Sequence, residues 1–408
     1  MLELLSDEAQ WRAFYQAKAE GGHMRAVELR DLERFIDGGE YLAVARAIQA
    51  GEPLPLPVAR EINKKRSAKK RMVFTYPRAY NYALKLIAWL LRRYDGVFSP
   101  NLHSFRQGMN VRRALRRLLS TPNLREHWVY KADVHDYFNS VDVELLLPKL
   151  RRVLADDPPL YEMLEGMLRC PQALRFGRPV TLRKGIMAGT PVSPFLANVC
   201  LMGLDARFEA LGAPYARYSD DIIVFAPNEE ALGQRVDIIH EELARQGLSI
   251  NPDKEAWSRP HEAWTFLGFT YRDGALDVAP ASVQKLKGKL RRKARALVRW
   301  RRRKGKDGGQ AARAFIRHFN RRLYDNPRRD ELTWALWYFP VINTDESLRA
   351  LDHYMQDCLR YIVAGNHGKK RFNLRYATLR EWGYRPLVHE YYLWRAAKDK
   401  PAPEAPES

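Results

Sequence analysis

Cysteine is scarce in this chain: its 408 residues include only Cys170, Cys200 and Cys358, which are widely separated. Three cysteines at such spacing exclude a disulfide framework and the paired-cysteine ligand sets of structural zinc sites. We therefore expect a protein of the reducing cytoplasm that folds without either kind of cross-link.

The sequence also lacks long apolar runs and has a deficit of acidic residues. No uninterrupted apolar segment approaches the ~18–20 residues that cross a bilayer, and the first residues carry acids where a secretory signal would be basic. Lysine and arginine number 69 against 48 aspartate and glutamate, which gives a net charge of +21. This balance excludes an acidic disordered chain and favours a polyanionic partner. Because no apolar run is long enough to span a bilayer, we expect no membrane partner.

Most of the excess positive charge lies in one segment. Residues 281–330 hold 19 lysines and arginines and three acids. Apolar residues recur there every three or four positions, at Val283, Leu286, Leu290, Ala294 and Leu297. This spacing predicts a helix with one narrow apolar face and basic residues around the rest. A solvated basic face, a helix on a membrane surface and a nucleic-acid-binding helix all fit such a run, and nearby aromatic residues favour the last.

Short predicted strands alternate with helices along the rest of the chain. Residues 1–50 are expected to form two helices divided at Gly21-Gly22, the second interrupted at Gly38-Gly39, followed by a stiff proline-rich connector at 53–60. The further elements that the pattern predicts are strands at 72–76 and 128–134, a long helix from Pro194, and a strand hairpin at 265–271.

Two adjacent acids, Asp220 and Asp221, lie between apolar runs that are typical of strands. An acid pair in a hairpin turn can have a purely local structural role. Alternatively, both can bind a divalent cation, which prefers carboxylate oxygens, and a two-metal site needs a third carboxylate. Asp133, at the end of an apolar strand, is the candidate for that third ligand. Asp136 and Asp142 compete with it, although Asp142 is better suited to cap a helix.

Five sequence blocks occur in a fixed order between about residues 70 and 271. They are Asp133-Val-His-Asp-Tyr-Phe138, Gly189-Thr-Pro-Val-Ser-Pro194, Tyr218-Ser-Asp-Asp221, Gly247-Leu-Ser-Ile-Asn-Pro-Asp-Lys254 and Phe266-Leu-Gly-Phe269. In this order they resemble the motifs of reverse transcriptases. Ser104-Phe105-Arg106 is similar to the fingers motif of the bacterial branch related to group II introns. The N-terminal helices, residues 62–74 and residues 376–395 most resemble the defence-associated reverse transcriptases.

The resemblance implies a right-hand polymerase of the α+β class, with an antiparallel palm sheet, mixed fingers, an all-helical thumb and a C-terminal helical extension. The expected boundaries are an N-terminal helical extension at 1–50, fingers at 51–125, palm at 126–280 with a fingers insertion near 145–188, a basic thumb at 281–335, an RNA-binding C-terminal extension at 336–398 and a disordered tail at 399–408. Ordinary helix packing is the alternative for the C-terminal extension.

The resemblance also implies how the chain binds nucleic acid. The basic helix falls in the thumb, where it would contact the phosphates of a template–primer duplex. The implied contacts are Lys289, Arg291, Arg292, Lys293 and Arg295 in the thumb, and Ser104, Phe105 and Arg106 in the fingers.

The same resemblance assigns roles to the acids. Asp133, Asp220 and Asp221 would hold two Mg²⁺ ions, with Val134 among the metal-binding positions. One ion would activate the primer 3′-hydroxyl and the other would neutralise the triphosphate. Lys254 would protonate the leaving pyrophosphate, and a surface lysine after a turn is the alternative.

The nucleotide-binding positions implied by the resemblance lie in three segments. They are Lys69 and Arg71 in the fingers, Asp136, Tyr137 and Phe138 after the palm strand, and Ala188 and Gly189 before the serine–proline pair. The two basic residues would clamp the triphosphate, or else belong to a solvated loop. Phe138 would lie under the sugar and exclude a ribose 2′-hydroxyl, which favours deoxynucleotides; a core aromatic is the alternative.

The segment Met187-Ala188-Gly189 departs from the Pro-Gln-Gly that most relatives carry. The glutamine normally lies against the incoming nucleotide, and Ala188 has no side-chain group that could hydrogen-bond there. Nucleotide selectivity, and with it strictly templated copying, is therefore in question.

The resemblance implies an RNA-directed DNA polymerase that uses dNTPs and Mg²⁺ to copy a dedicated non-coding RNA into DNA, in antiphage defence. The alternatives are a template-independent DNA-synthesising enzyme of the same fold, a retron-type polymerase, and a non-catalytic RNA-binding splicing helper. The complete set of three carboxylates disfavours the last of these.

Overall fold

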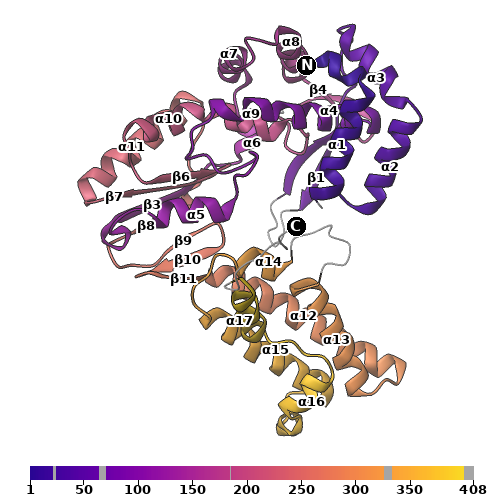
Figure 1. Ribbon diagram of the computed structural model, residues 1–408, viewed down its shortest axis with the longest axis vertical. Coiled ribbons are helices and arrows are strands. Elements are labelled where there is room, and N and C mark those ends of the chain that lie inside the picture. The colour runs from indigo at the N-terminus through magenta and orange to yellow at the C-terminus, as the bar shows by residue number, and fades with distance from the viewer. Residues whose placement is uncertain (22–23, 64–69, 184, 326–332, 399–408) are drawn as a thin grey trace, which may run out of the picture. The chain divides into compact units, whose positions relative to one another are not determined.

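The computed structural model describes residues 1–21, 24–63, 70–183, 185–325 and 333–398 (Figure 1). The chain divides into two compact units, Met1–His261 and Glu262–Ser408. Lys69, a predicted triphosphate contact, and the tail at 399–408, predicted to be disordered, lie outside the described residues. None of the described helices is long and apolar enough to cross a membrane.

A four-stranded antiparallel sheet forms the palm of the first unit, in the order β6-β7-β3-β8. Its strands are β3 (Trp128–Asp133), β6 (Tyr215–Tyr218), β7 (Asp221–Ala226) and β8 (Ala256–Ser258). The apolar side chains of β7 are fully buried, and α11 (Glu229–Arg245) packs on β7 and β3 (Figure 1). The antiparallel palm sheet predicted from the sequence is confirmed.

Two helices, α9 (Ser193–Cys200) and α10 (Met202–Ala210), replace the single long helix predicted from Pro194. The break is at Leu201, whose φ of −105° and ψ of 17° lie outside the helical range. Next to it, the carbonyl of Cys200 accepts a hydrogen bond from Lys149 Nζ at 2.6 Å. A side chain of α7 (Val143–Val153) thus satisfies a carbonyl at the break, so the interruption is tolerated inside the core.

A second sheet forms the fingers, in the order β2-β1-β4-β5. Its strands are β1 (Val58–Asn63), β2 (Lys70–Thr75), β4 (Gln172–Arg175) and β5 (Arg178–Thr181). Because β1 pairs with both β2 and β4, residues 58–60 are a strand and not part of the predicted connector. The β4–β5 hairpin is not predicted from the sequence, because its two turn residues with positive φ are Phe176 and Gly177, and phenylalanine gives no turn signal.

The N-terminal helices pack together against one side of the fingers. They are η1 (Leu2–Ser6), α1 (Glu8–Gly21), α2 (Ala26–Asp37) and α3 (Glu40–Gln49), which contact α4 (Arg78–Leu90), followed by η2 (Leu91–Val97). The Trp11 ring lies 5.5 Å from Phe35 and 5.7 Å from Tyr41. The predicted interruption at Gly38-Gly39 separates α2 from α3, because Gly39 has a φ of +65°, which glycine adopts without strain.

The other described helices of the first unit are α5 (Val111–Leu119), η3 (Leu124–Glu126), α6 (Tyr137–Ser140), α8 (Pro158–Arg169) and η4 (Pro252–Lys254). Asp142 caps α7: its Oδ1 accepts hydrogen bonds from the N–H groups of Glu144 at 2.9 Å and Leu145 at 3.4 Å. The capping interpretation is confirmed, and Asp142 is removed from the candidate metal ligands.

The second unit begins with a small antiparallel sheet, β9 (Trp264–Phe266), β10 (Phe269–Arg272) and β11 (Ala275–Val278). Leu267 and Gly268, both with positive φ, connect the first two strands as a tight hairpin, as predicted. The sequence groups residues 262–280 with the palm, whereas these strands belong to the second compact unit.

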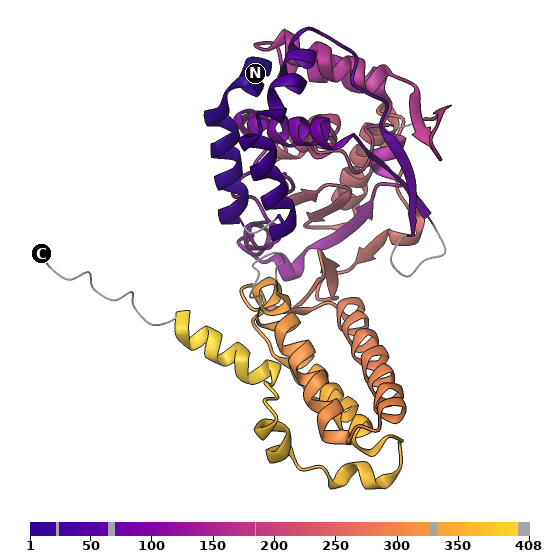
Figure 2. The same ribbon diagram turned by 90° about the vertical axis from the view of Figure 1, so that its right-hand side faces the viewer.

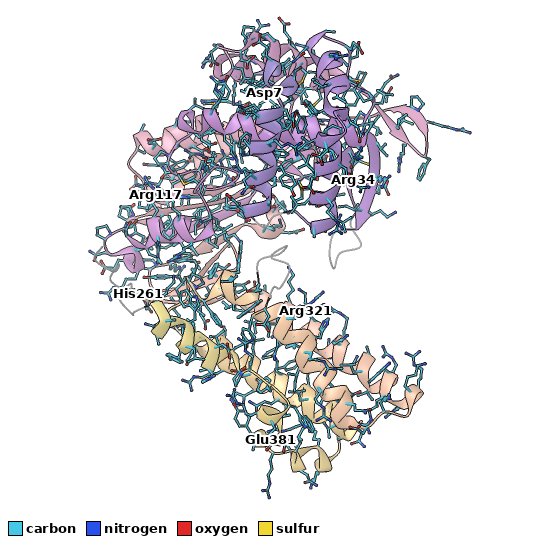
Figure 3. The ribbon with its side chains drawn as sticks, turned by 45° about the vertical axis from the view of Figure 1, so that its right-hand side comes forward. Asp7, Arg34, Arg117, His261, Arg321 and Glu381 are labelled. Carbon is cyan, nitrogen blue, oxygen red and sulfur yellow. The ribbon has the colours of Figure 1, made fainter. Side chains whose placement is uncertain are left out.

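Helices form the rest of the described second unit. They are α12 (Pro280–Lys304), α13 (Gly308–Leu323), α14 (Trp334–Tyr338), α15 (Glu346–Ala364), η5 (Lys369–Asn373), α16 (Tyr376–Glu381) and α17 (Leu387–Lys398). Helices α12, α13 and α15 pack along one another (Figure 2). The apolar face predicted for the basic helix is the buried face of α12, with Leu290 fully enclosed. Basic side chains occupy the outer faces, including Arg321 on α13 (Figure 3).

Candidate active site

Three aspartates converge at the end of the palm sheet. Asp133 ends β3 and Asp221 begins β7, and the two residues are paired in the antiparallel register. The N–H of Val134 donates to the carbonyl of Asp220 at 3.0 Å, which holds the third aspartate beside them. One carboxylate oxygen from each of the three lies within 4.8 Å of the others. The structure therefore brings together the three acids that the sequence singles out.

The turn between β6 and β7 determines how Asp220 and Asp221 are oriented in the carboxylate cluster. Ser219 in this turn has a φ of +60°, which is uncommon for a residue with a side chain. Its N–H donates to Ser104 Oγ at 2.8 Å, and its carbonyl accepts from Arg217 Nη1 at 3.1 Å. Both backbone polar groups of the strained residue are thus held by side chains from the core.

A buried ion pair supports this turn, and the sequence gives no direct prediction of it. Arg217 on β6 and Asp205 on α10 are both fully buried. Tyr215 also donates to Asp205, through its hydroxyl at 2.9 Å. Although burial opposes the charge, Asp205 raises the pKa of Arg217 overall. The only sequence signal for this pair is an arginine and an aspartate in otherwise apolar segments.

Ser104 extends the support to α9. Its hydroxyl donates to Asn198 Oδ1 at 3.3 Å, and Asn198 Nδ2 donates back to the carbonyl of Ser104 at 3.1 Å. The polar groups in this network are satisfied, so it can rigidify the turn without leaving unpaired polar atoms.

The donor set fits a hard divalent cation. Burial raises the pKa of Asp220, and the nearby charge of Asp133 adds to the effect. Burial likewise raises the pKa of Asp221, to about 6. Three carboxylates this close repel one another in a partly dry environment, and a bound divalent ion would offset that repulsion. Val134 could contribute only its carbonyl oxygen, because its side chain is a hydrocarbon.

Lys254 lies at the same centre. It ends η4, and its Nζ donates to Asp133 Oδ2 at 2.6 Å. Burial lowers the pKa of Lys254, but the hydrogen bond to Asp133 and the surrounding acids raise it overall. The backbone is also fixed to the site, since the N–H of Asn251 donates to the carbonyl of Asp133 at 2.7 Å.

The residues that follow β3 have different environments. Asp136 adopts a left-handed conformation with a φ of 41°, and its carboxylate accepts from Asn139 Nδ2. The Tyr137 side chain is buried and donates to the carbonyl of Ala197 at 2.6 Å, so only its backbone could contact a nucleotide. Phe138 is half-buried, with its ring centroid 5.8 Å from that of Tyr137.

The segment at Ala188 and Gly189 is attached to the fingers sheet. The carbonyl of Ala188 accepts from the N–H of Phe74 on β2 at 2.8 Å. Gly189 has a φ of 101°, and a β-carbon there would lie 3.1 Å from the carbonyl oxygen of Phe74. Glycine is therefore required for this close approach. Arg71, the described member of the predicted triphosphate clamp, is exposed on the same strand.

The predicted fingers motif separates into structural and exposed positions. Ser104 is fully buried, and the Arg106 guanidinium donates to the backbone carbonyls of Ser99, Leu102 and Asp95. The Ser104 hydroxyl and the terminal guanidinium nitrogens of Arg106 are thus used in folding, and direct nucleic-acid contact by these two residues stays a prediction. Phe105 is 47% exposed and remains a candidate contact.

His103, next to this motif, is buried with neither ring nitrogen hydrogen-bonded within the described part of the chain. Burial and then the charges of Arg117 (labelled in Figure 3) and Arg106 lower its pKa to about 4.

In the second unit, the predicted thumb contacts lie on the outer faces of α12. Lys289, Arg291, Arg292 and Arg295 are exposed, and Lys293 is half-buried.

A basic cavity that the sequence does not reveal lies between α1, α4 and the motif segment. Lys18, Lys85 and Arg92 line a volume of about 340 Å³ together with Trp89 and Gly189. None of the three cations forms an ion pair with another described residue. Burial, followed by the charges of Arg92 and Lys85, lowers the pKa of Lys18. Cations that repel one another in a cavity favour an anionic ligand.

A family model described as "Reverse transcriptase (RNA-dependent DNA polymerase)" matches residues 62–271, half of the chain. The chain belongs to this reverse transcriptase family. The match covers the three aspartates, Lys254 and the segment at Ala188, so the carboxylate cluster lies inside the family domain.

Sequence and structure comparisons also give individual proteins that are similar to parts of this chain. The chain is 28% identical over 182 residues to the Retron Mx65 reverse transcriptase of Myxococcus xanthus. The aligned segment covers 42% of this chain and 41% of that protein's length. Among solved structures, an apo telomerase from Candida tropicalis, truncated from its C-terminal domain, is 13% identical with a TM-score of 0.44 over 55% of each chain. A telomerase from Candida albicans in complex with a fragment of telomeric RNA is 12% identical with a TM-score of 0.45, over 82% of this chain and 64% of that one.

Proposed function

We propose that this chain is an RNA-directed DNA polymerase that joins deoxynucleotides by two-metal nucleotidyl transfer. The observation that carries the proposal is the cluster of Asp133, Asp220 and Asp221, whose carboxylate oxygens lie within 4.8 Å of one another inside a reverse transcriptase domain. Carboxylates at this spacing suit a pair of Mg²⁺ ions, which favour oxygen ligands and phosphate.

The three aspartates would hold the two ions, which supply Lewis acidity toward the primer 3′-hydroxyl and neutralise charge on the triphosphate. The protein contributes a rigid arrangement of these acids through the β3–β7 register and the Ser219 turn. Lys254, bonded to Asp133 at 2.6 Å, is the cation from which the leaving pyrophosphate would receive a proton.

Substrate choice would come from the segments around Phe138 and Gly189. We infer that the half-buried Phe138 ring limits space at the 2′ position of the sugar and selects dNTPs. Arg71 on β2 would bind the triphosphate, since β2 is connected to the motif segment by the Phe74–Ala188 hydrogen bond.

The negatively charged template would bind to the basic surfaces of the chain. The basic cavity of Lys18, Lys85 and Arg92 borders Gly189, so a template strand that passes the motif segment would find phosphate partners there. The outer faces of α12 would bind a template–primer duplex as the thumb. Residues 336–398 would form an RNA-binding extension.

The biological role follows from sequence resemblance. The group II intron-like motifs and the similarity of residues 62–74 and 376–395 to defence-associated enzymes support synthesis on a dedicated non-coding RNA in antiphage defence. The partial match to a retron enzyme supports a retron-type polymerase as the related alternative.

A second candidate function is template-independent DNA synthesis. It is favoured by Ala188, whose side chain is a methyl group and whose carbonyl is already bonded to Phe74. No hydrogen bond from this side chain can therefore test the fit of an incoming nucleotide to a template base.

Primer extension distinguishes these candidates. The purified chain is incubated with Mg²⁺, dNTPs and a labelled DNA primer, either annealed to an RNA template or alone. The proposed function predicts a product of template length only with the annealed primer, whereas growth of the free primer would support template-independent synthesis. No product in either reaction would contradict both. Sequencing nucleic acid that copurifies with the chain would identify a dedicated RNA.

A further inference from the structure

The C-terminal end of α15 is fixed by α12 and α13. Arg301 Nη1 donates to the carbonyls of Ile362 and Val363, both at 2.6 Å, and Arg302 Nη2 donates to the carbonyl of Gly365 at 2.9 Å. At the start of α13, a β-carbon on Gly308 would lie only 2.7 Å from the carbonyl oxygen of Val363. The last turn of α15 is thus anchored by two guanidinium groups and a close backbone contact.

A hollow of about 520 Å³ lies beyond this anchored end, which is within the usual size range of ligand sites. Val363 and Ala364 line one part of it, and Asn366, Lys369, Arg371 and Asn373 line another. The described lining residues include no carboxylate, so the walls offer cations, amides and apolar surface.

The segment after α15 is folded back in a defined way. The ring of Tyr361 stacks on His367 with centroids 4.4 Å apart, and Arg371 Nη1 lies 3.1 Å from His367 Nδ1. The N–H of Gly368 donates to Asn366 Oδ1 at 2.8 Å. These contacts preorganise the walls before any ligand binds.

An exposed aromatic ring stands next to the hollow. Phe372 is 57% exposed, and the guanidinium carbons of Arg371 and Arg360 lie 4.7 and 5.9 Å from its ring centroid. The Nε atoms of both arginines are buried without a hydrogen-bond partner in the described structure. An exposed ring with guanidinium groups close by is suited to stacking with a base, and the cations can bind the phosphates beside that base.

We propose that this site, the α15 hollow with Phe372, binds unpaired RNA: one nucleotide enters the hollow and the neighbouring base stacks on Phe372. Lys369 and Arg371 would pair with phosphate, and Asn366 and Asn373 can donate to and accept from base edges. Single-stranded RNA is favoured over a duplex, because stacked and paired bases would not present a free face to Phe372. The choice of RNA as the polymer rests on the proposed function.

The test uses the full chain with Lys369→Ala combined with Phe372→Leu. The matched control is Arg152→Ala combined with Phe176→Leu, which removes one exposed cation from α7 and one exposed ring from the β4–β5 turn. Affinities are measured by fluorescence anisotropy for a labelled, non-self-pairing 12-nucleotide RNA and for the same RNA annealed to its complement. Unfolding curves establish that both variants are folded.

We expect the α15-hollow variant to bind the single strand about tenfold or more weakly, as base–aromatic stacking implies, with duplex affinity within about twofold of wild type. The control should bind both RNAs as wild type does. Equal losses for single strand and duplex, or no loss, would overturn the proposal. Unchanged single-strand affinity in the α15-hollow variant, with a loss of binding to labelled polyglutamate, would overturn it in favour of an acidic protein partner.

Extension of oligo(dT) on poly(rA) separates this proposal from the polymerase proposal. The variant should retain wild-type extension, since the hollow is not part of the carboxylate cluster. Absence of extension in the wild type, with selective single-strand binding intact, would contradict the polymerase assignment and still support the RNA site.

Discussion

Arg217 and Asp205 form a fully buried, bidentate ion pair that also supports the β6–β7 turn, which carries Asp220 and Asp221. Arg217 Nε and Nη2 donate to the two carboxylate oxygens of Asp205 at 2.8 and 2.5 Å. The remaining nitrogen, Nη1, donates to the carbonyl of Ser219, the residue with positive φ before Asp220. One side chain thus links the interior of the palm to the position of Asp220.

Arg217→Met should lower the free energy of unfolding by about 3–5 kcal/mol, because Asp205 would stay buried without its partner. Arg217→Lys keeps the charge but loses the two-pronged geometry and the bond to Ser219. We expect this variant to fold and to lose at least about tenfold in kcat for primer extension, with a smaller change in KM. Urea unfolding and steady-state kinetics measure the two effects.

Arg207→Lys is the matched control, since Arg207 lies on the same helix as Asp205 but forms ion pairs with Glu241 and Glu242 nearer the surface. This variant should change neither the free energy of unfolding nor kcat for primer extension appreciably. A wild-type kcat in Arg217→Lys would show that the ion pair stabilises the palm without positioning the acids.

The carboxylate cluster could be predicted from the sequence because its members lie in short motifs. Asp133 ends an apolar strand and Asp220-Asp221 separate two others, so local pattern and resemblance point to the same three acids. Their support could not be predicted, since it depends on contacts between distant segments. Ser104 meets Ser219 across 115 positions of sequence and Asn198 across 94.

Residues that are neighbours in one sequence motif can also differ in burial, and the sequence does not predict which of them is exposed. Ser104, Phe105 and Arg106 are adjacent in sequence, yet the first is enclosed, the second is exposed and the third bonds to backbone carbonyls. The β4–β5 hairpin escapes prediction for a different reason: Phe176 adopts positive φ at a turn where asparagine or glycine is the usual signal.

Replacing both turn acids, Asp220→Asn with Asp221→Asn, should abolish DNA synthesis and leave RNA affinity within about twofold, because phosphate contacts and not metal ligands dominate binding. Without metal, the thermal midpoint of the variant should equal or exceed that of wild type, since repulsion within the cluster is relieved. Added Mg²⁺ should raise the midpoint of the wild type only.

Differential scanning calorimetry with EDTA and with Mg²⁺ provides this comparison, alongside primer extension and RNA binding. Asp237→Asn, at an acid on α11 outside the cluster, is the control. An Mg²⁺ effect of equal size in wild type and double variant would show that the ions bind elsewhere.

Buried His103 should make stability depend on pH. Its pKa is lowered from 6.5 to about 4 by burial and neighbouring arginines. Between these values the unfolded state binds more protons, so the free energy of unfolding should fall as pH drops from 6.5 toward 4, by up to about 1.4 kcal/mol per pH unit. His103→Phe should flatten this part of the curve.

Urea midpoints between pH 4.5 and 7 measure the slope for wild type, His103→Phe and the control His240→Phe, whose substitution is at an exposed position of α11. The same slope in all three proteins would mean that other groups control stability in this range.

Phe138→Ala should admit ribonucleotides. The ring is half-buried, and in its proposed place under the sugar its removal would open space there without removing a catalytic group. We expect the ratio of kcat/KM for dNTP over rNTP to fall by about tenfold or more, with little change in kcat for dNTP. Phe105→Ala, an exposed phenylalanine in the same unit, should leave the ratio unchanged. An unaltered ratio in Phe138→Ala would assign this ring to packing alone.

The basic face of α12 should bind phosphates regardless of sequence. The buried side of this helix is occupied by apolar residues such as Leu290, so its arginines lie on the outside. We expect neutralisation of four residues to weaken binding of an RNA–DNA duplex and to reduce the dependence of log K on log salt by somewhat under one for each lost contact. The four substitutions are Arg291→Gln, Arg292→Gln, Lys293→Gln and Arg295→Gln.

A salt titration of duplex affinity measures this slope for wild type, for the four-fold variant and for a control of equal charge change. The control carries Arg25→Gln, Arg30→Gln, Arg34→Gln and Arg46→Gln on the N-terminal helices. Lost affinity with a reduced slope only in the α12 variant would identify the helix as the phosphate-binding thumb. Because a membrane-surface helix would bind anionic vesicles through the same cations, flotation with vesicles is run in parallel. Equal slopes in all three proteins, with vesicle binding lost in the α12 variant, would assign the basic face to a lipid surface and require another segment to grip the duplex.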